Sequence, residues 1–362
     1  MPFPQDPLFL AEAAEEPATL RTRARRVRPP RPTTKGRPRP AIGPDEFVTD
    51  ARPPTRDDDP ELWTVRDALM ELDPDGVRTG YAIREALDQI YDGQRTGRWD
   101  YTQLLKTEKT HMGTLVEIWL QREFCFEDGI DLDYLIAGAD VDCKWSLNLY
   151  EWEIPIEMYR YGPKIALVVW GNDYTAHWAA GLIRISEEVL REKGKQRDGK
   201  RKLNNRGRDR ILWLHREAEL VKNTLLHIRN PAKRDSIVYA DAGQTAVNNL
   251  FRELTGELVN RATVLTAAQQ VDSAKRVRDA RKHLRPDGIV IFGHYNPHPR
   301  MAAELHLPTP TLGRFVSTRV APWRTGDPEP HTEIQGSRWR RARSSDPVTP
   351  APLLPRQSRE QS

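Results

Sequence analysis

Hydrophobic positions along the chain become regular only after about Pro60, and their spacing then changes from segment to segment. Over Thr79–Tyr91 the apolar residues recur three and four positions apart, which predicts an amphipathic helix. Lys164–Trp170 is a continuous apolar run between two glycine-containing turns, and it predicts a strand buried on both faces. Trp178–Ile185 predicts a further strand. The first part of the ordered chain therefore mixes helices with strands.

A second set of periodic segments begins after about residue 223 and is mainly helical. Helices are expected over Gly243–Leu258, Thr263–Gln270 and Asp272–Leu284, followed by a turn and a strand over Ile289–Gly293. Helix, short helix, basic helix and wing is the order of a winged helix-turn-helix. The pattern therefore predicts a DNA-binding unit, although a solvated helix with several arginines has the same composition.

Composition divides the chain further. Charged residues make up 30%, mean hydropathy is −0.70 and 29 residues are proline, which is too polar for compact structure throughout. Proline and charge concentrate near both ends, so both ends are expected to be disordered. The predicted boundaries are a tail over residues 1–59, a first domain over 60–213, a linker over 214–222, a DNA-binding domain over 223–323 and a second tail over 324–362.

Charge and cysteine content narrow the class of protein. The net charge is only +4, with a pI near 9.0, so any basic surface must be local. The Arg/Pro-rich segment Arg21–Pro40 either attracts DNA by releasing counterions or is a solvated tail with no role. The two cysteines, Cys125 and Cys143, give no disulfide framework and fit a reducing compartment. Without a signal peptide or a membrane-length apolar run, a cytoplasmic protein with no membrane partner is expected.

The candidate chemistry lies in two short strands, Leu132–Ala137 and Asp140–Trp145, joined by a glycine turn. Side chains alternate along a strand, so Asp142 and Lys144 point to the same face. Asp133, on the partner strand, can approach them across the hairpin. Two carboxylates beside an ammonium suit phosphodiester hydrolysis, because carboxylates bind Mg²⁺ and the cation stabilises the charge that develops on the phosphate.

A short Asp-x-Lys pattern is weak evidence alone, since it also describes charges on a solvated strand. Glu117, in the helical segment before the hairpin, adds a third acid. Asp140 shares the charged face, where it is either a solvated charge at the sheet edge or a support for the ligands. The opposite face is apolar, and such a division is expected at a functional site or on an edge strand.

Two other segments leave alternatives open. Lys106 and Lys109, which precede Glu117, either follow a phosphate backbone or lie in a solvated loop. The segment Ile90-Tyr91-Asp92-Gly93 is similar to the Lys-x-Asp-Gly motif of nucleotidyltransferases and ligases, but isoleucine has no amine that could form an adenylate. We therefore expect this segment to be the end of a helix.

Several segments occur in an order that one family shares, across both parts of the chain from about Pro60 to about Pro322. They are Leu87–Trp99, Lys106–His111, Gly113–Ile118, Leu120–Phe124, Leu132–Tyr134, Asp142–Lys144, Ala267–Gln270 and Lys275–Arg281. In these segments the chain resembles the NaeI-type restriction endonucleases of the type IIE class. Both tails are longer than the family pattern.

The resemblance implies a fold, an activity and a set of functional residues. The fold would be an α/β nuclease core of the PD-(D/E)xK type, a mixed sheet flanked by helices, followed by a mainly α, CAP-like winged helix-turn-helix domain. The catalytic positions would be Glu117, Asp133, Asp142 and Lys144, with Mg²⁺ held by the three acids. The residues expected to contact DNA are Lys106, Lys109, Gln269, Gln270, Lys275, Arg276, Arg278 and Lys282.

The resemblance also implies partners and specificity. It implies a homodimer that binds two copies of double-stranded DNA, one as substrate and one as effector. The implied site is GCCGGC, cut to blunt ends. A restriction enzyme further implies a companion DNA methyltransferase that protects the host. The alternatives are a DNA-binding regulator that has lost its nuclease, against which the intact quartet of charged residues argues, and a mismatch repair nuclease of the same fold.

Overall fold

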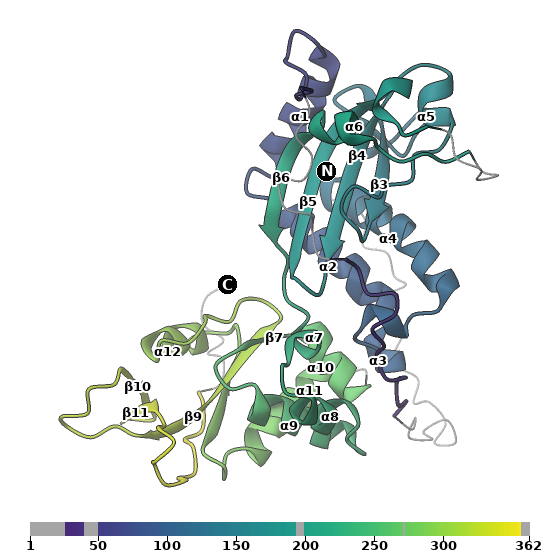
Figure 1. The fold of residues 1–362 in the computed structure, drawn as a ribbon. Helices are drawn as coiled ribbons and strands as arrows, with labels where there is room; N and C mark the ends of the chain where they lie inside the picture. The colour runs from purple at the N-terminus through teal and green to yellow at the C-terminus, as the bar shows by residue number, and fades with distance from the viewer. Residues whose placement is uncertain (1–25, 40–49, 193–198, 271, 356–362) are drawn as a thin grey trace, which may run out of the picture.

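The chain folds into two units, each built around its own sheet (Figure 1). The computed structural model describes residues 26–39, 50–192, 199–270 and 272–355. The first unit contains α1 (Pro60–Leu72), α2 (Val77–Tyr91), α3 (Gly93–Thr96), a 3-10 turn (Tyr101–Gln103), α4 (Lys106–Phe124), β1 (Glu127–Asp128), β2 (Tyr134–Ile136), β3 (Ala139–Ser146), α5 (Glu157–Arg160), β4 (Lys164–Asn172), β5 (His177–Ile185), a second 3-10 turn (Glu187–Val189), α6 (Asn205–Asp209) and β6 (Leu212–Glu219). The second contains α7 (Thr224–His227), α8 (Pro231–Val238), α9 (Gly243–Glu253), β7 (Leu258–Asn260), α10 (Arg261–Ala268), α11 (Ser273–His283), β8 (Ile289–Phe292), α12 (His298–Glu304), β9 (Arg314–Pro322), β10 (His331–Ile334) and β11 (Ser337–Arg341).

The first sheet is mixed and has six strands in the order β1-β2-β3-β4-β5-β6. Strands β3 and β4 run parallel, and the other neighbouring strands are antiparallel. Strand β4 lies inside the sheet and is buried on both faces, as its continuous apolar sequence predicts. The α/β character expected from the sequence is therefore present.

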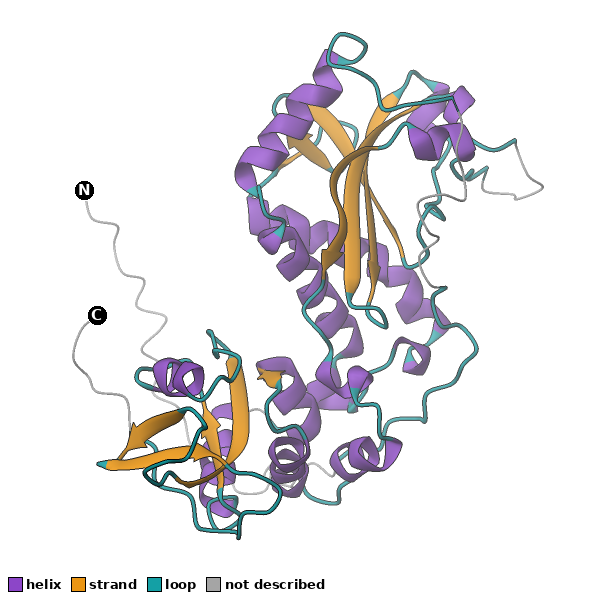
Figure 2. Cartoon of the chain, turned by 60° about the vertical axis from the view of Figure 1, so that its left-hand side comes forward, coloured by secondary structure: helices purple, strands orange, loops and turns teal. Residues whose placement is uncertain are grey.

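Two hydrophobic clusters cover the two faces of this sheet, and Figure 2 shows helices lying against one of these faces. On one face α1, α2 and α4 pack against β3, β4 and β5, and α2 contributes fully buried Ile83 and Leu87. On the other face Trp152 and Trp170 are fully buried. Burying a large apolar side chain stabilises the fold by roughly 1.5–3 kcal/mol, so the helices are fixed chiefly by their apolar stripes.

The hairpin β2–β3 forms where the sequence predicts it. Ala137 and Gly138 have φ of 49° and 82°, which is the left-handed backbone that a two-residue hairpin turn requires at both positions. Tyr134 pairs with Val141. This register places residues 133 and 142 opposite each other at the open end of the hairpin.

The second sheet has five strands, all paired antiparallel, with β9 as the strand that joins them. Helices α8, α9, α10 and α11 pack beside it around one cluster that includes Leu250 and Phe251. The mainly α domain predicted from the sequence contains this antiparallel sheet as well as its helices. The prediction of a helix reaching Leu258 was wrong. Helix α9 ends at Glu253, and Leu258 begins β7, which pairs with β9.

Part of the segment predicted as a disordered tail over residues 324–362 is folded. Strands β10 and β11 extend the second sheet, and the Arg340 guanidinium is buried between Asp327 and Asp346. The sequence here is polar because its interior is partly ionic, and composition alone cannot distinguish paired charges from solvated ones. Residues 356–362 lie outside the described part.

The linker predicted over residues 214–222 is largely strand β6. Among the strands of the described residues, β6 pairs only with β5, so it lies at the edge of the sheet and needs few apolar residues. Irregular pairing near Ala180 and a positive φ at Glu217 break its alternation. The sequence of this irregular edge strand lacks the alternation of a strand, and it was therefore predicted to be a linker.

Residues 26–39 form an extended segment, here called the strap, that contacts both units. The strap belongs to the predicted disordered tail over residues 1–59, but it makes specific hydrogen bonds with folded partners that composition cannot reveal. Residues 1–25 and 40–49 of that predicted tail lie outside the described part.

Candidate active site

The hairpin β2–β3 and helix α4 bring the predicted acids and lysine together. Asp133 immediately precedes β2 and lies opposite Asp142 by the hairpin register. Lys144 follows on the same face of β3, and Glu117 comes from α4. Four charged residues that are up to 27 positions apart in the sequence thus lie in one region.

Asp142 and Lys144 form an ion pair in a largely buried environment. The ammonium contacts Asp142 Oδ2, and this oxygen has no accompanying hydrogen bond of normal geometry. Burial raises the pKa of Asp142 to about 6, against the opposing effect of Lys144. Burial acts to lower the pKa of Lys144, but the paired carboxylate outweighs it and the pKa is raised. The lysine is therefore charged at neutral pH, and the acid titrates in an accessible range.

Asp133 is held by the backbone of the opposite strand. Its Oδ2 accepts a hydrogen bond from the Cys143 N–H at 2.6 Å. This bond fixes one carboxylate oxygen beside Asp142 and leaves the other for a ligand. The two acids are thus positioned by the hairpin itself rather than by flexible loops.

Helix α4 is tied to the hairpin next to Glu117. The buried Tyr134 hydroxyl donates to the Glu117 carbonyl oxygen at 2.8 Å. Burial, and then the nearby Asp133 carboxylate, raises the pKa of Glu117; Lys144 opposes this effect and Asp142 adds to it. Glu117 is therefore near enough to Asp133, Lys144 and Asp142 to interact with them electrostatically.

Two further acids support or border the cluster. Asp140 accepts hydrogen bonds from the Ile130 and Asp131 N–H groups at 2.7 and 3.1 Å, so it holds the loop before β2. Glu157, from α5, contributes to the raised pKa of Asp142. No pattern in the sequence pointed to Glu157, because only the folding of α5 over this face brings it near.

Comparison with known proteins identifies the family of the chain. The profile of the family described as "Restriction endonuclease NaeI" matches residues 64–350. The chain belongs to the NaeI restriction endonuclease family. The type II restriction enzyme NaeI of Lentzea aerocolonigenes is 47% identical over 312 residues, which cover 83% of this chain and 96% of that protein. Family membership makes the chain a restriction endonuclease, which is a site-specific deoxyribonuclease, and confirms the resemblance inferred from its sequence.

Restriction endonucleases typically need a metal ion, and the residues of this cluster have the type of ligand atom that such an ion binds. Glu117, Asp133 and Asp142 offer only hard oxygen donors, which suit Mg²⁺. Asp142 Oδ2 already contacts the Lys144 ammonium, so this oxygen lies where positive charge is accepted. Within the described ranges, however, no three His, Cys, Asp or Glu side chains are close enough together to coordinate one ion. The carboxylates lie in one region of the structure, but their oxygens do not form a coordination sphere around a single point.

The predicted DNA contacts of this NaeI-family chain divide into exposed and engaged side chains. Gln270, Lys275, Arg278 and Lys282 are exposed, while Arg276 is half-buried and pairs with Gln244 across to α9. Gln269 is bonded to the strap. Lys106 and Lys109 lie in the first turn of α4, and Lys109 Nζ is 5.2 Å from the centre of the Tyr101 ring. Four of the eight residues thus remain exposed on the second unit's surface.

The ligase-like segment is a contact between the two units of the NaeI-family fold. As expected, Tyr91 ends α2. A Cβ on Gly93 would lie 2.1 Å from Thr266 Oγ1 of α10 and 2.9 Å from the Arg98 carbonyl oxygen. Glycine is required here by the close approach of α10 and not by adenylate chemistry.

No helix in the described part of the chain is both long and apolar enough to cross a membrane.

Proposed function

We propose that this protein hydrolyses double-stranded DNA at the palindrome GCCGGC, leaves blunt ends, depends on Mg²⁺ and is activated by a second DNA site. The observation that carries the proposal is the buried Asp142–Lys144 pair with Asp133 and Glu117 beside it. Three acids and one cation, largely removed from water, are unfavourable to fold and suited to phosphoryl chemistry. Family membership supports a DNA substrate.

Each member of the cluster has a distinct role in this proposal. Asp142 and the free oxygen of Asp133 would hold Mg²⁺, with Glu117 as a further ligand or as the acceptor for a metal-bound water. The ion, when bound, polarises the scissile phosphate and lowers the pKa of its water. Lys144 holds its charge near the phosphate, where it stabilises the negative charge that develops during attack. Asp142 must be ionised to bind the ion, so protonation of this carboxyl stops the reaction.

The second unit is proposed to read the effector copy of the site as a winged helix-turn-helix. Helices α10 and α11 follow each other in the chain, and β8 and β9 form an antiparallel pair beside them. Helix α11 would enter a major groove with Lys275, Arg278 and Lys282 toward the DNA. Its exposed side carries these cations, which supports α11 as the reading helix.

The proposed site has two-fold symmetry, and this implies two copies of the chain. A homodimer would place one catalytic cluster at each strand of the palindrome, so that both strands are cut. An active enzyme of this kind requires a companion DNA methyltransferase, since unmodified GCCGGC in the host chromosome would otherwise be cut.

The proposal is tested by digestion of two plasmids that carry one or two GCCGGC sites, with and without Mg²⁺. We expect discrete blunt-ended fragments from the two-site plasmid, slow cutting of the one-site plasmid and no cutting without metal. Added duplex carrying GCCGGC should accelerate the one-site reaction. A discrete pattern at another sequence would discard the site but keep the enzyme. No cleavage of any DNA would favour the DNA-binding regulator.

A further inference from the structure

The strap is an unusually cationic segment that lies outside residues 64–350, the range that the family profile matches. It contains six basic residues and no acidic residue among its 14 positions. The basic residues are Arg26, Arg28, Arg31, Lys35, Arg37 and Arg39. Such a segment would repel itself and remain mobile unless it were anchored.

One end of the strap is anchored to the second unit. The Arg26 guanidinium donates to the carbonyl oxygens of Val238, Ala240 and Ala267, near the ends of α8 and α10. The Gln269 side chain forms a reciprocal pair with Val27, accepting from its N–H at 2.6 Å and donating to its carbonyl at 2.8 Å. These bonds fix both the direction and the register of the strap.

The remainder of the strap is anchored to the first unit. Gln103 donates to the Pro30 carbonyl at 2.6 Å, and the Thr33 N–H donates to Thr102 Oγ1 at 3.0 Å. The Arg39 N–H donates to Asn148 Oδ1 at 2.8 Å, and its carbonyl accepts from Asn172. Apart from Arg26, these hydrogen bonds use backbone groups of the strap, so they remain when its other basic side chains are changed. Arg31 and Arg37 also lie over the rings of Tyr239 and Tyr174, 4.9 and 5.2 Å from the ring centres.

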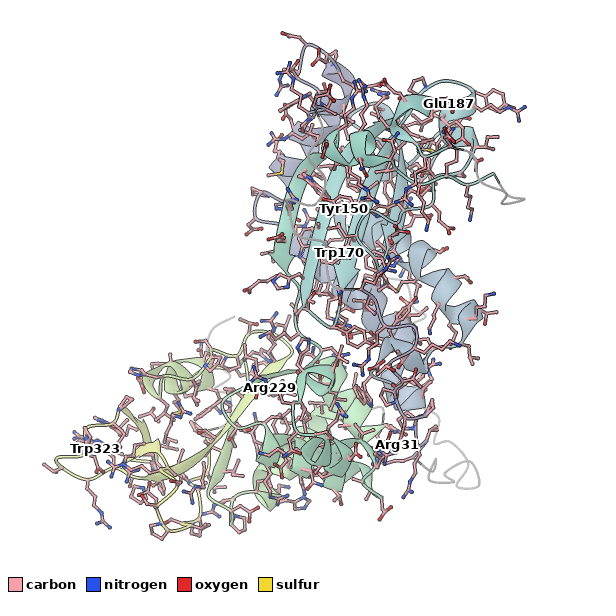
Figure 3. All side chains as sticks on the ribbon, in the orientation of Figure 1. Arg31, Tyr150, Trp170, Glu187, Arg229 and Trp323 are labelled. Carbon is pink, nitrogen blue, oxygen red and sulfur yellow. The ribbon has the colours of Figure 1, made fainter. Side chains whose placement is uncertain are left out.

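The five basic side chains of the strap other than Arg26 are largely in solvent. Arg28, Arg31 and Arg39 are 71%, 75% and 72% exposed, and Lys35 and Arg37 are also exposed. The ion pairs to Asp241, Asp235 and Glu151 involve exposed cations, and ion pairs of exposed cations contribute little to stability. A phosphate can therefore replace these partners with little loss. In Figure 3, Arg31 lies on the side of the second unit that faces away from Trp323.

The strap runs between two groups of predicted DNA contacts. Lys109 Nζ lies 3.8 Å from the position of a Cβ on Gly36, and Lys109, Gly113 and Glu117 share one face of α4 at spacings of four residues. At its other end the strap meets Gln269, which precedes α11. The fixed row of cations thus leads from the proposed reading helix toward the catalytic cluster.

We propose that the strap is a phosphate-binding ridge, whose exposed cations contact the backbone of duplex DNA held by the enzyme. The proposal rests on the proposed function, since it names further contacts for the same DNA. Each phosphate that a cation neutralises releases counterions, and log K then falls with log salt with a slope of about −0.9 per contact. Because the backbone is already fixed by anchors, little ordering entropy is lost on binding.

The test is the salt dependence of duplex binding by the full chain without Mg²⁺, for Arg31→Gln/Lys35→Gln/Arg37→Gln against the wild type. A matched control carries Arg300→Gln, Arg324→Gln and Arg338→Gln, three exposed cations of the second unit. We expect the slope of log K against log salt concentration to be smaller in magnitude by about 1–3 for the strap variant than for the wild type, and to be unchanged for the control. The loss should be equal for GCCGGC and for an unrelated duplex, because phosphates carry no sequence information.

The proposal would be overturned if the strap variant showed the same salt dependence of duplex binding as the control, even if the thermal unfolding midpoint of the strap variant changed. If the triple variant fails to fold, Lys35→Glu alone should still reduce the slope by about 1, and an unchanged slope would again overturn it. Cleavage by the wild type is measured on the same preparation. A wild type that neither binds nor cuts duplex DNA contradicts both proposals, whereas normal cutting with an unchanged strap slope contradicts only this one.

Discussion

At the scale of single residues, the cluster shows why its members are unfavourable to bury together. Asp142 is only 7% exposed, and two other acids lie close to it while one ammonium pairs with it. Like charges in a dry region raise each other's pKa, and the lysine offsets this only in part. A divalent cation would relieve the remaining repulsion, so binding of the ion and completion of the site are linked.

Two substitutions of Asp133 distinguish the effect of its negative charge from the effect of its hydrogen bond. The amide oxygen that Asp133→Asn introduces still accepts from the Cys143 N–H, so this variant should keep wild-type stability but lose at least roughly a hundredfold in cleavage rate. Asp133→Ala should lose the same activity and also about 1–3 kcal/mol of unfolding free energy, because the N–H is left without an acceptor. Urea unfolding and single-turnover cleavage measure the two effects. Equal stability of the two variants would contradict the role of this bond.

The pKa of Asp142 near 6 predicts how stability depends on pH in the metal-free protein. A folded-state pKa above the unfolded value favours the protonated form, so this contribution is full below about pH 4 and is lost as pH rises to about 6. In EDTA, the wild type should therefore lose on the order of 2–3 kcal/mol relative to Asp142→Asn between pH 4 and pH 7. Parallel stability curves for the two proteins would show that burial does not perturb this carboxyl.

At the scale of elements, the strongest sequence patterns predicted the right structure. The hairpin β2–β3 and strands β4 and β5 follow from alternation, a glycine turn and continuous apolar runs. Short or polar strands were missed: β6 carries edge-strand polarity, β7 has three residues and β11 contains three arginines. Their existence depends on partners far away in the sequence, which periodicity cannot report.

The close contact between α3 and α10 predicts that adding one methyl group at Gly93 destabilises the protein, and that a second substitution at Thr266 restores part of the stability. Gly93→Ala should destabilise the protein by about 1–3 kcal/mol, because its Cβ overlaps Thr266 and the Arg98 carbonyl. Thr266→Gly should recover much of this loss in a double-mutant cycle, since it removes one of the two overlapping groups. Thermal unfolding of the four proteins measures the coupling. Additive effects would contradict a direct contact between the two units at this point.

Helix α11 predicts that neighbouring arginines behave differently. Arg278→Ala should leave stability unchanged and weaken duplex binding by roughly tenfold, because the side chain is exposed on the proposed reading face. Arg276→Ala should lower the free energy of unfolding by about 0.5–1.5 kcal/mol, because it removes the hydrogen bond to Gln244. Two-site activation should fall in this variant only together with the loss of stability. Denaturant midpoints and gel-shift titrations distinguish them. The reverse assignment of effects would place Arg276, not Arg278, at the DNA.

At the scale of the whole molecule, the two units are joined by a buried polar network and by the strap. Asp173, in the turn after β4, accepts from Arg84 at 2.6 Å, from the Tyr91 hydroxyl at 2.9 Å and from Asn223 at 3.1 Å. Asn223 begins the second unit and Arg84 and Tyr91 belong to α2, so Asp173 links the second unit to α2 by hydrogen bonds. The network offers a physical route for the proposed effector signal.

The sequence could predict the catalytic candidates but not this assembly. Glu117, Asp133, Asp142 and Lys144 stand out by charge pattern and by family resemblance. The Asp173 network, the nearness of Glu157 and the strap anchors join residues that are up to 242 positions apart, and each side chain there is an ordinary polar residue in its local context. Such contacts are properties of the fold, so only the structure shows them.

Single-turnover cleavage of a GCCGGC duplex by Asp142→Asn is the measurement that tests the proposed catalytic centre most directly. Asp131→Asn, which changes an exposed acid near the same hairpin, is the matched control. We expect a rate at least roughly a hundredfold below the wild type for Asp142→Asn, duplex affinity within about threefold of the wild type, and a control that cuts normally. Cleavage by Asp142→Asn at a rate near that of the wild type, with Mg²⁺ present, would contradict the assignment of this cluster as the active site.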